Sequence, residues 1–365
     1  MTLNELNIIN FKNIAEADLT FTAGFNCFVG KNGVGKTNIL DAIYHLSMCK
    51  SYFNLSDSQN IRHSEPFYVV QGKYSREDEK IDIYCGVKRG QKKVFKKNQK
   101  VYEKLSEHIG LLPLVMISPE DVVLIDGGSE ERRKLVDGII SQCDRNYLYQ
   151  LIRYNKALVQ RNALLKTGEG KRLDLEILDI WNEQLAENGE RIMQGRMNFL
   201  QEFTVVFQSY YEQLSLGREE VELSYKPSVA SGALLAGLQA AFEKDRALTY
   251  TTVGIHRDDL VLNLGKYPVK KTGSQGQKKT FLIALKLAQY AWLYRMSGVK
   301  PLLLLDDIFD KLDADRVGQI VNIVGGELFG QVFMTDTNRE HIDEILRQQA
   351  CDYRLFTVVD GRVIS

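Results

Sequence analysis

The first thirty residues alternate between apolar and polar positions with the period of two that is typical of β-strands. The alternation runs through 6–11 and 17–21 and ends in a compact apolar run at 25–29. A glycine-rich turn follows, and Ile39 and Ile43 then begin a pattern with helical spacing. The succession of strand, turn and helix predicts the beginning of an α/β unit.

The pattern changes twice further along the chain. Residues 66–102 form short apolar stretches separated by charged or glycine-containing turns, which predicts an antiparallel sheet edge. Residues 130–215 carry apolar side chains at helical spacing, interrupted by a polar turn at 166–171. We expect a helical hairpin or small bundle here, inserted between two α/β portions. The apolar spacing is not a sustained heptad, so no long coiled coil is expected.

The α/β character returns after residue 220. Alternating stretches at 221–225 and 260–264 predict two strands, and an amphipathic helix is expected over roughly 276–294. The uninterrupted apolar run Leu302–Leu305 is typical of a strand that is buried on both faces, and 332–334 resembles it.

Composition narrows the class of protein. Of the 365 residues, 44% are hydrophobic and 26% are charged, which indicates a folded globular chain and excludes a largely disordered one. Lys and Arg number 47 and so do Asp and Glu, so only local patches of charge can indicate nucleic-acid binding.

Membrane insertion and secretion are not expected. The apolar stretch 281–294 is too short to span a bilayer and contains Lys286 and Gln289. Glu5 lies near an N-terminus that has no basic segment, which argues against a secretory signal. The five cysteines are widely spread and form no C-x-x-C pair, which predicts a cytoplasmic protein without structural zinc.

The strongest chemical motif is a match to G-x-x-x-x-G-K-[ST], which about 1–2% of chains of this length contain by chance. It follows a predicted strand and precedes a predicted helix, where backbone N–H groups and the helix N-terminus can surround phosphate oxygens. Lys36 would contact the β- and γ-phosphates, and the Thr37 hydroxyl would ligate Mg²⁺. A glycine-rich turn with an accidental Lys-Thr is the structural alternative. The motif is Gly30, Lys31, Asn32, Gly33, Val34, Gly35, Lys36 and Thr37.

Two acids follow the apolar run Leu302–Leu305. Strand ends of this kind point carboxylates at the sheet edge where α/β proteins bind ligands. Asp306 would hold Mg²⁺, directly or through water, and Asp307 would accept a proton from an attacking water. With Lys36, these two are the candidate catalytic residues. The alternative is that the two acids simply end the strand and begin a turn.

Ser274-Gln275-Gly276-Gln277 begins the long predicted helix and has two interpretations. Ser274 and Gln277 have the spacing of an S-x-x-Q capping box, which is a structural feature. The functional alternative is a second phosphate site, formed by the serine hydroxyl and the helix N-terminus.

The motifs follow one another in the order of the ATP-binding cassette (ABC) ATPases: a phosphate loop, a long insert, S-x-G-Q and a strand that ends in acids. Within that superfamily the chain resembles the RecF family of bacterial repair proteins, which are related to the heads of SMC proteins. The resemblance runs nearly end to end. Lys12, Ser129 and Ile255 depart from the family, which usually has Arg, Pro and Pro there. The matching segments are Asn10–Ile14, Ser118–Asp121, Gly127–Ser129, Arg132–Asp137, Gln160–Lys166 and Gly254–Leu260.

The resemblance implies an α/β fold of the ABC-type ATPase head (a P-loop NTPase lobe) with an inserted, mainly helical second lobe. The first lobe would comprise 1–115 and 250–365, and the second 116–249. Two such heads sandwich two ATP molecules, so Ser274, Gly276 and Gln277 would complete the partner's site in an ATP-dependent homodimer.

Other residues qualify that implication. Residues 311–313 fall at the family's dimer-contacting loop, but Asp310-Lys311 replaces its usual Ser-Glu. Asp307 stands where many cassette ATPases have Glu, which suggests a weak DNA-dependent ATPase that acts as a switch. Lys12 and Asn13 are candidates for reaching the nucleotide.

Local basic patches bear on DNA. The segment 88–100 is strongly basic and is either a DNA-facing hairpin or a solvated sheet edge that lysines protect from aggregation. A second excess is formed by Lys270, Lys271, Lys278 and Lys279. No motif for base recognition is present, so contacts to DNA backbone and shape are expected. His256 is interpreted as a structural or interface residue.

The resemblance implies an ATP-dependent DNA-binding protein of recombinational repair and replication-fork maintenance. It would dimerise on duplex or gapped DNA, hydrolyse ATP slowly and help load recombinase with RecO and RecR. An ATPase subunit of an ABC transporter is the main alternative. A small-molecule kinase and an SMC-type tether are less well supported, because the S-x-G-Q helix argues against the first and the absence of long heptads against the second.

Overall fold

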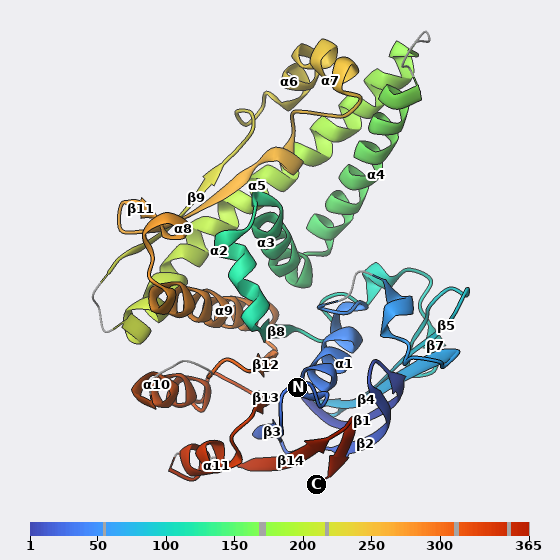
Figure 1. Cartoon of the computed structure of the whole chain (residues 1–365). Coiled ribbons are helices and arrows are strands. Elements are labelled where there is room, and N and C mark those ends of the chain that lie inside the picture. Colours follow the sequence, from blue (N-terminus) through green and yellow to red (C-terminus); the bar gives the residue numbers. More distant parts are fainter. Residues whose placement is uncertain (54–55, 168–172, 216–218, 310–313, 349–351, 365) are drawn as a thin grey trace. The chain divides into compact units, whose positions relative to one another are not determined.

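The computed structural model describes the chain except for residues 54–55, 168–172, 216–218, 310–313, 349–351 and 365 (Figure 1). Its contacts divide the chain into two units, one formed by Met1–Asp121 with Lys286–Ser365 and the other by Val122–Leu285. The units change after Asp121 and after Leu285, whereas the lobe boundaries expected from the sequence are 115/116 and 249/250. Those lobe boundaries remain a prediction. The second unit therefore includes the S-x-G-Q motif.

A six-stranded sheet in the first unit carries the phosphate-loop and acidic motifs. Its order is β15-β14-β3-β13-β12-β8; the strands from β14 to β8 are parallel, and β15 pairs antiparallel with β14. Every residue of β3, β12 and β13 is buried, in agreement with their largely apolar sequences. The bounds are β3 Phe25–Val29, β8 Leu114–Ile117, β12 Leu302–Asp306, β13 Val332–Asp336, β14 Tyr353–Val359, β15 Arg362–Ile364, α1 Lys36–Met48, α10 Ala314–Val324 and α11 Arg339–Gln348.

The first unit also holds an antiparallel sheet in the order β2-β1-β4-β5-β6-β7. The expectation of antiparallel strands over 66–102 is confirmed. Buried side chains of β1 and β4, among them Leu6 and Val70, share one hydrophobic core with Ile39 and Ile43 of α1, so the helix that follows the phosphate loop is anchored by burial of its apolar face. The strands are β1 Thr2–Phe11, β2 Ile14–Thr20, β4 Phe67–Arg76, β5 Glu79–Lys88, β6 Val94–Lys97 and β7 Lys100–Val101. Short 3-10 helices, labelled η, are η1 Asp57–Asn60, η2 Leu105–Glu107 and η3 Pro119–Val122.

The second unit contains the predicted helical hairpin. The long helix α5 runs alongside α4 (Figure 1). The strands expected at 221–225 and 260–264 are present, but they pair with each other in a three-stranded sheet, β11-β10-β9, and do not join the parallel sheet. The bounds are α2 Val123–Asp126, α3 Ser129–Cys143, α4 Arg145–Thr167, α5 Leu175–Ser215, β9 Val221–Lys226, α6 Leu234–Ala240, α7 Phe242–Leu248, η4 Ile255–Arg257, β10 Asp259–Leu264, β11 Tyr267–Pro268, α8 Val269–Thr272 and α9 Gln275–Ser297.

A buried arginine organises the second unit. Arg196, in the middle of α5, pairs with Asp137 of α3 at 2.9 Å and with Asp258 at 3.4 Å. Its guanidinium also donates to the Ile255 carbonyl oxygen at 2.9 Å. Two segments on which the family resemblance rests, 132–137 and 254–260, therefore meet at one side chain. Because an unpaired buried charge is strongly unfavourable, this network fixes those segments to the long helix.

A second buried ion pair stands where the chain leaves the first unit and returns to it. Lys286 is the first residue after the return and Asp121 the last before the exit, and their Nζ and Oδ1 atoms are 2.7 Å apart. Lys286 also donates to the Met116 carbonyl oxygen at 2.9 Å, and the Tyr52 hydroxyl donates to Asp121. The pair thus joins the two passages of the chain at the edge of the parallel sheet, next to β8.

Candidate nucleotide-binding site

The phosphate-loop motif has the backbone that its chemistry requires. It connects β3 to α1, and Gly33 and Gly35 have φ values of 82° and 116°, in the left-handed region that favours glycine. A Cβ atom on Gly35 would also lie 2.7 Å from the side-chain amide of Asn13. The loop therefore leads into the N-terminus of α1, an arrangement that suits an anion.

The Lys36 ammonium lies within the loop. Its Nζ donates to the carbonyl oxygens of Gly30 at 2.7 Å and Lys31 at 2.9 Å, and the residue is buried. Burial lowers the pKa of Lys36, whereas the carboxylates at the ends of β12 and β13 oppose that shift. The positive charge is thus held against the phosphate loop, as its expected role beside the β- and γ-phosphates requires.

Asp306, at the end of β12, is brought against the loop. Its Oδ1 accepts hydrogen bonds from the hydroxyls of Thr37 and Thr335, both at 2.8 Å. Burial raises the pKa of Asp306, against the effect of these two hydrogen bonds. A hydroxyl and a carboxylate side by side are the hard oxygen donors that Mg²⁺ takes beside a phosphate loop, so the residues present fit this ion.

Asp307 has an unusual backbone. Its φ of 48° lies in the left-handed region, which costs about 1–3 kcal/mol for a residue other than glycine and persists only where neighbours enforce it. Its N–H donates to the Thr335 hydroxyl at 2.9 Å. The two acids expected to be catalytic therefore lie next to each other at the carboxyl edge of the sheet. Asp307 also begins a turn, as expected if the two acids simply end the strand.

The two candidates before β2 have different surroundings. The Asn13 side chain donates to the Val34 carbonyl oxygen at 3.1 Å and accepts from Asn38 at 2.8 Å, so it braces the tip of the phosphate loop. Lys12 instead pairs with Asp41 of α1 at 2.6 Å. The structure ties both residues to the loop and its helix, and their contact with a nucleotide stays a prediction.

The S-x-G-Q segment forms the capping box. The Ser274 N–H donates to Gln277 Oε1 at 2.7 Å, and the Gln277 N–H donates to Ser274 Oγ at 3.2 Å. Ser274 is nevertheless exposed at the N-terminus of α9. The structural interpretation is confirmed, and the functional one is compatible with it, since the hydroxyl proton is not used by the cap. The expected dimer-contacting loop, 310–313, lies outside the described residues.

Thr335, which joins the two acids, was missed at the sequence level. The only signal was that the apolar run 332–334 also ends in polar residues, Thr335 and Asp336, as the run before Asp306 does. The Gly30 N–H donates to the Asp336 carbonyl oxygen at 3.2 Å, so the end of β13 also supports the phosphate loop.

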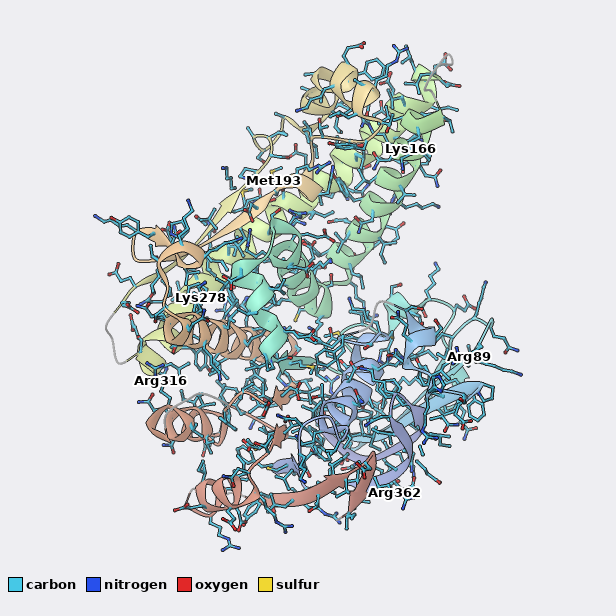
Figure 2. All side chains as sticks on the ribbon, in the orientation of Figure 1. Arg89, Lys166, Met193, Lys278, Arg316 and Arg362 are labelled. Atoms are coloured by element: carbon cyan, nitrogen blue, oxygen red, sulfur yellow. The ribbon has the colours of Figure 1, made fainter. Side chains whose placement is uncertain are left out.

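The basic segment 88–100 forms the β5–β6–β7 edge of the antiparallel sheet, and its basic residues differ in pairing and exposure. Lys93 pairs with Asp57 at 2.8 Å and Lys97 with Glu79 at 3.1 Å, so these two lysines serve the structure. Figure 2 marks Arg89 at the turn after β5. The exposed basic residues of the segment are Lys88, Arg89, Lys92 and Lys100.

Other sequence candidates have structural partners. Lys278 pairs with Asp126 at 2.8 Å. His256 lies between the Tyr154 hydroxyl at 2.8 Å and the Thr251 carbonyl oxygen at 3.0 Å, and burial lowers its pKa to about 4. In the part of the chain that the structure describes, no helix has the length and apolar character needed to cross a membrane.

Comparisons with known proteins agree with this geometry. The family model "RecF/RecN/SMC N terminal domain" matches residues 2–352. The DNA replication and repair protein RecF of Phocaeicola vulgatus is 52% identical over all of this chain and 98% of its own length. The RecF of Flavobacterium johnsoniae is 50% identical over 98% of this chain and all of its own length.

Solved structures give the same result. A structure described as the recombination mediator protein RecF with ATP in the RecFOR pathway has a TM-score of 0.91 and 32% identity, over 99% of this chain and 96% of that one. An SMC head bound to the winged-helix domain of ScpA has a TM-score of 0.59 at 18% identity, over 100% of this chain and 97% of that one, which supports the fold alone.

Proposed function

Since the chain belongs to the RecF/RecN/SMC N-terminal domain family, we propose that it is an ATP-dependent DNA-binding protein of recombinational repair and replication-fork maintenance. The observation that carries the proposal is the joining of Thr37 and Asp306 through one carboxylate oxygen beside a complete phosphate loop. This geometry supports MgATP binding, and RecF relatives of about 50% identity span the whole chain.

Within that site, each residue has a distinct role. The loop from Gly30 to Thr37 surrounds the phosphates, and Lys36 neutralises the charge of the β- and γ-phosphates. Thr37 and Asp306 would hold Mg²⁺, and the ion would supply positive charge beside the phosphates. Asp307 accepts the proton of the attacking water. Because its side chain is one methylene shorter than Glu, hydrolysis is slow and the protein acts as a switch.

The active form is a homodimer that ATP holds together. Ser274 is exposed at the N-terminus of a 23-residue helix, and its hydroxyl can donate to a phosphate while the cap remains formed. In the dimer, Ser274, Gly276 and Gln277 of one copy face the γ-phosphate held by the other. ATP therefore shifts the population toward the closed dimer, and hydrolysis releases it.

The closed dimer binds duplex or gapped DNA through the phosphate backbone. The exposed basic residues at the β5–β6–β7 edge supply part of this contact, and their effect depends steeply on salt. Since a solved RecF neighbour is described as a recombination mediator in the RecFOR pathway, we assign RecO and RecR as partners in recombinase loading, in the bacterial cytoplasm. A transporter ATPase is not favoured, because the full-length relatives are RecF proteins.

Sedimentation and duplex-DNA binding with ATP, with ADP and without nucleotide test the proposal. The wild-type protein is expected to dimerise and to bind DNA more tightly with ATP than with ADP or without nucleotide. Lys36→Ala is expected to lose both responses, because it removes the charge that faces the phosphates. A wild-type protein that neither binds ATP nor changes its affinity for DNA with nucleotide would refute the proposal.

A further inference from the structure

Thr335 lies where three parts of the site converge. β13, which carries it, stands between β3, which leads into the phosphate loop, and β12, which ends in Asp306. In the parallel register, Asp306 is opposite Thr335 on one side and Phe28 is opposite it on the other. Thr335 is 1% exposed, so its hydroxyl has no access to bulk water and must be satisfied within the protein.

The hydroxyl of Thr335 makes a hydrogen bond with each of the two acids. Its single proton is donated to Asp306 Oδ1 at 2.8 Å, and its oxygen accepts the Asp307 N–H at 2.9 Å. The first bond orients a carboxylate that, under the proposed function, holds Mg²⁺. The second holds the backbone of the residue that faces the attacking water. One side chain therefore controls the geometry of both acids.

The backbone of Asp307 explains why such control is needed. A non-glycine residue at φ 48° relaxes toward negative φ unless its neighbours oppose it. Relaxation would swing the Cβ atom, and with it the carboxylate, away from its present direction. The Thr335 hydroxyl holds the Asp307 N–H and so opposes that rotation. The strained turn directly follows the rigid, wholly buried strand β12.

We propose that Thr335 is a positioning residue for ATP hydrolysis, which fixes the metal-binding carboxylate and the water-facing acid in one arrangement through its hydroxyl. This inference rests on the proposed function. It assigns to Thr335 an effect on the hydrolytic step and not on nucleotide binding, because the phosphate loop makes its own contacts with the phosphates.

The test compares Thr335→Val, which keeps the shape of the side chain but removes the hydroxyl, with Thr335→Ser, which keeps the hydroxyl. Thr335→Val is expected to lower kcat by about 10- to 100-fold, since displacement of a catalytic group by ~1 Å has effects of this size. Its affinity for a fluorescent ADP analogue should stay within about threefold of wild type. Thr335→Ser should recover most of kcat. Thr204→Val, which loses a hydroxyl bonded to a carbonyl within α5, is the matched control and should hydrolyse ATP as wild type does.

A second readout does not depend on turnover. With ATP present, Thr335→Val should form dimers that persist longer than wild-type dimers, because the γ-phosphate is removed more slowly. Thr335→Ala, which places no methyl group beside the carboxylate, is measured in parallel in case the valine variant does not fold, and the same losses are expected of it.

Wild-type kcat in a folded Thr335→Val or Thr335→Ala protein would overturn the inference. An equal loss of nucleotide affinity and kcat would also overturn it, because this would indicate a structural role. Failure of wild type itself to hydrolyse ATP would refute the proposed function together with the inference, so the two failures are distinguishable.

Discussion

Replacing Ser274 by Asp separates the structural role of this residue from its proposed role in the dimer. Asp is as good an N-cap as Ser, and its carboxylate is favourable at a helix N-terminus, so the capping box with Gln277 should survive. The free energy of unfolding should therefore change by less than about 0.5 kcal/mol. In the ATP-bound dimer, however, the new negative charge would face the partner's triphosphate.

The size of the effect follows from charge repulsion at the exposed end of α9. Two unit charges of the same sign about 4 Å apart repel by about 4 kcal/mol at an effective dielectric constant of ~20. This weakens each composite site by roughly a thousandfold. Because a twofold dimer contains two such sites, the ATP-dependent dimer should not be detectable at micromolar protein.

The assay is sedimentation velocity with and without ATP, together with a fluorescent-nucleotide titration of the monomer. Ser274→Asn is the matched control, because the Asn side chain has nearly the same shape as Asp and caps the helix without carrying a charge. Ser274→Asp should bind nucleotide as a monomer with wild-type affinity and should fail to dimerise, whereas Ser274→Asn should retain most of the dimer. If Ser274→Asp dimerised normally, or if its monomer lost nucleotide affinity, the reasoning would be refuted.

Two further predictions concern pH and DNA. Burial lowers the pKa of three histidines, to about 3 in one and about 4 in two, so the folded protein keeps them neutral while the unfolded chain protonates them near 6.5. The free energy of unfolding should therefore be highest above pH 6.5 and fall as the pH drops toward 4, by up to about 1.4 kcal/mol per pH unit for each histidine. Urea unfolding at pH 7, 6, 5 and 4 measures this slope. A free energy of unfolding that does not change with pH would contradict the prediction. Replacing the four exposed basic residues of the β5–β6–β7 edge by Ser should weaken duplex binding and reduce the slope of log K against log salt concentration by up to about 4. Replacing the ion-paired Lys93 and Lys97 should instead mainly lower stability. Equal effects of the two sets on DNA binding would count against the assignment. The histidines are His45, His108 and His256, and the exposed basic residues are Lys88, Arg89, Lys92 and Lys100.

Local features of the site could be predicted from the sequence because the residues involved are neighbours in the chain. The phosphate loop needs only glycines at the right spacing between a strand and a helix. The capping box needs only Ser274 and Gln277 three residues apart. The end of an apolar run likewise located Asp306 at a sheet edge.

The remaining features depend on which strands become neighbours, and the apolar pattern does not contain this information. Thr335 meets Asp306 only because β13 lies beside β12, although 29 positions separate the two residues in the chain. Alternation identified the strand at 260–264, but not that it would pair with β9 in a separate sheet. The division of the chain after Leu285 likewise depends on contacts between distant segments, and the lobe boundary expected at 249 stays a prediction.

The central claim is that each ATP is held by the phosphate loop of one copy and by Ser274 of another. Mixing Lys36→Ala with Ser274→Asp tests it most directly, since each variant alone lacks one half of every site. The account predicts that the mixture regains ATP-dependent dimers and hydrolysis, up to about a quarter of the wild-type sites by random pairing. A mixture no more active than its separate components would contradict a site shared between two copies.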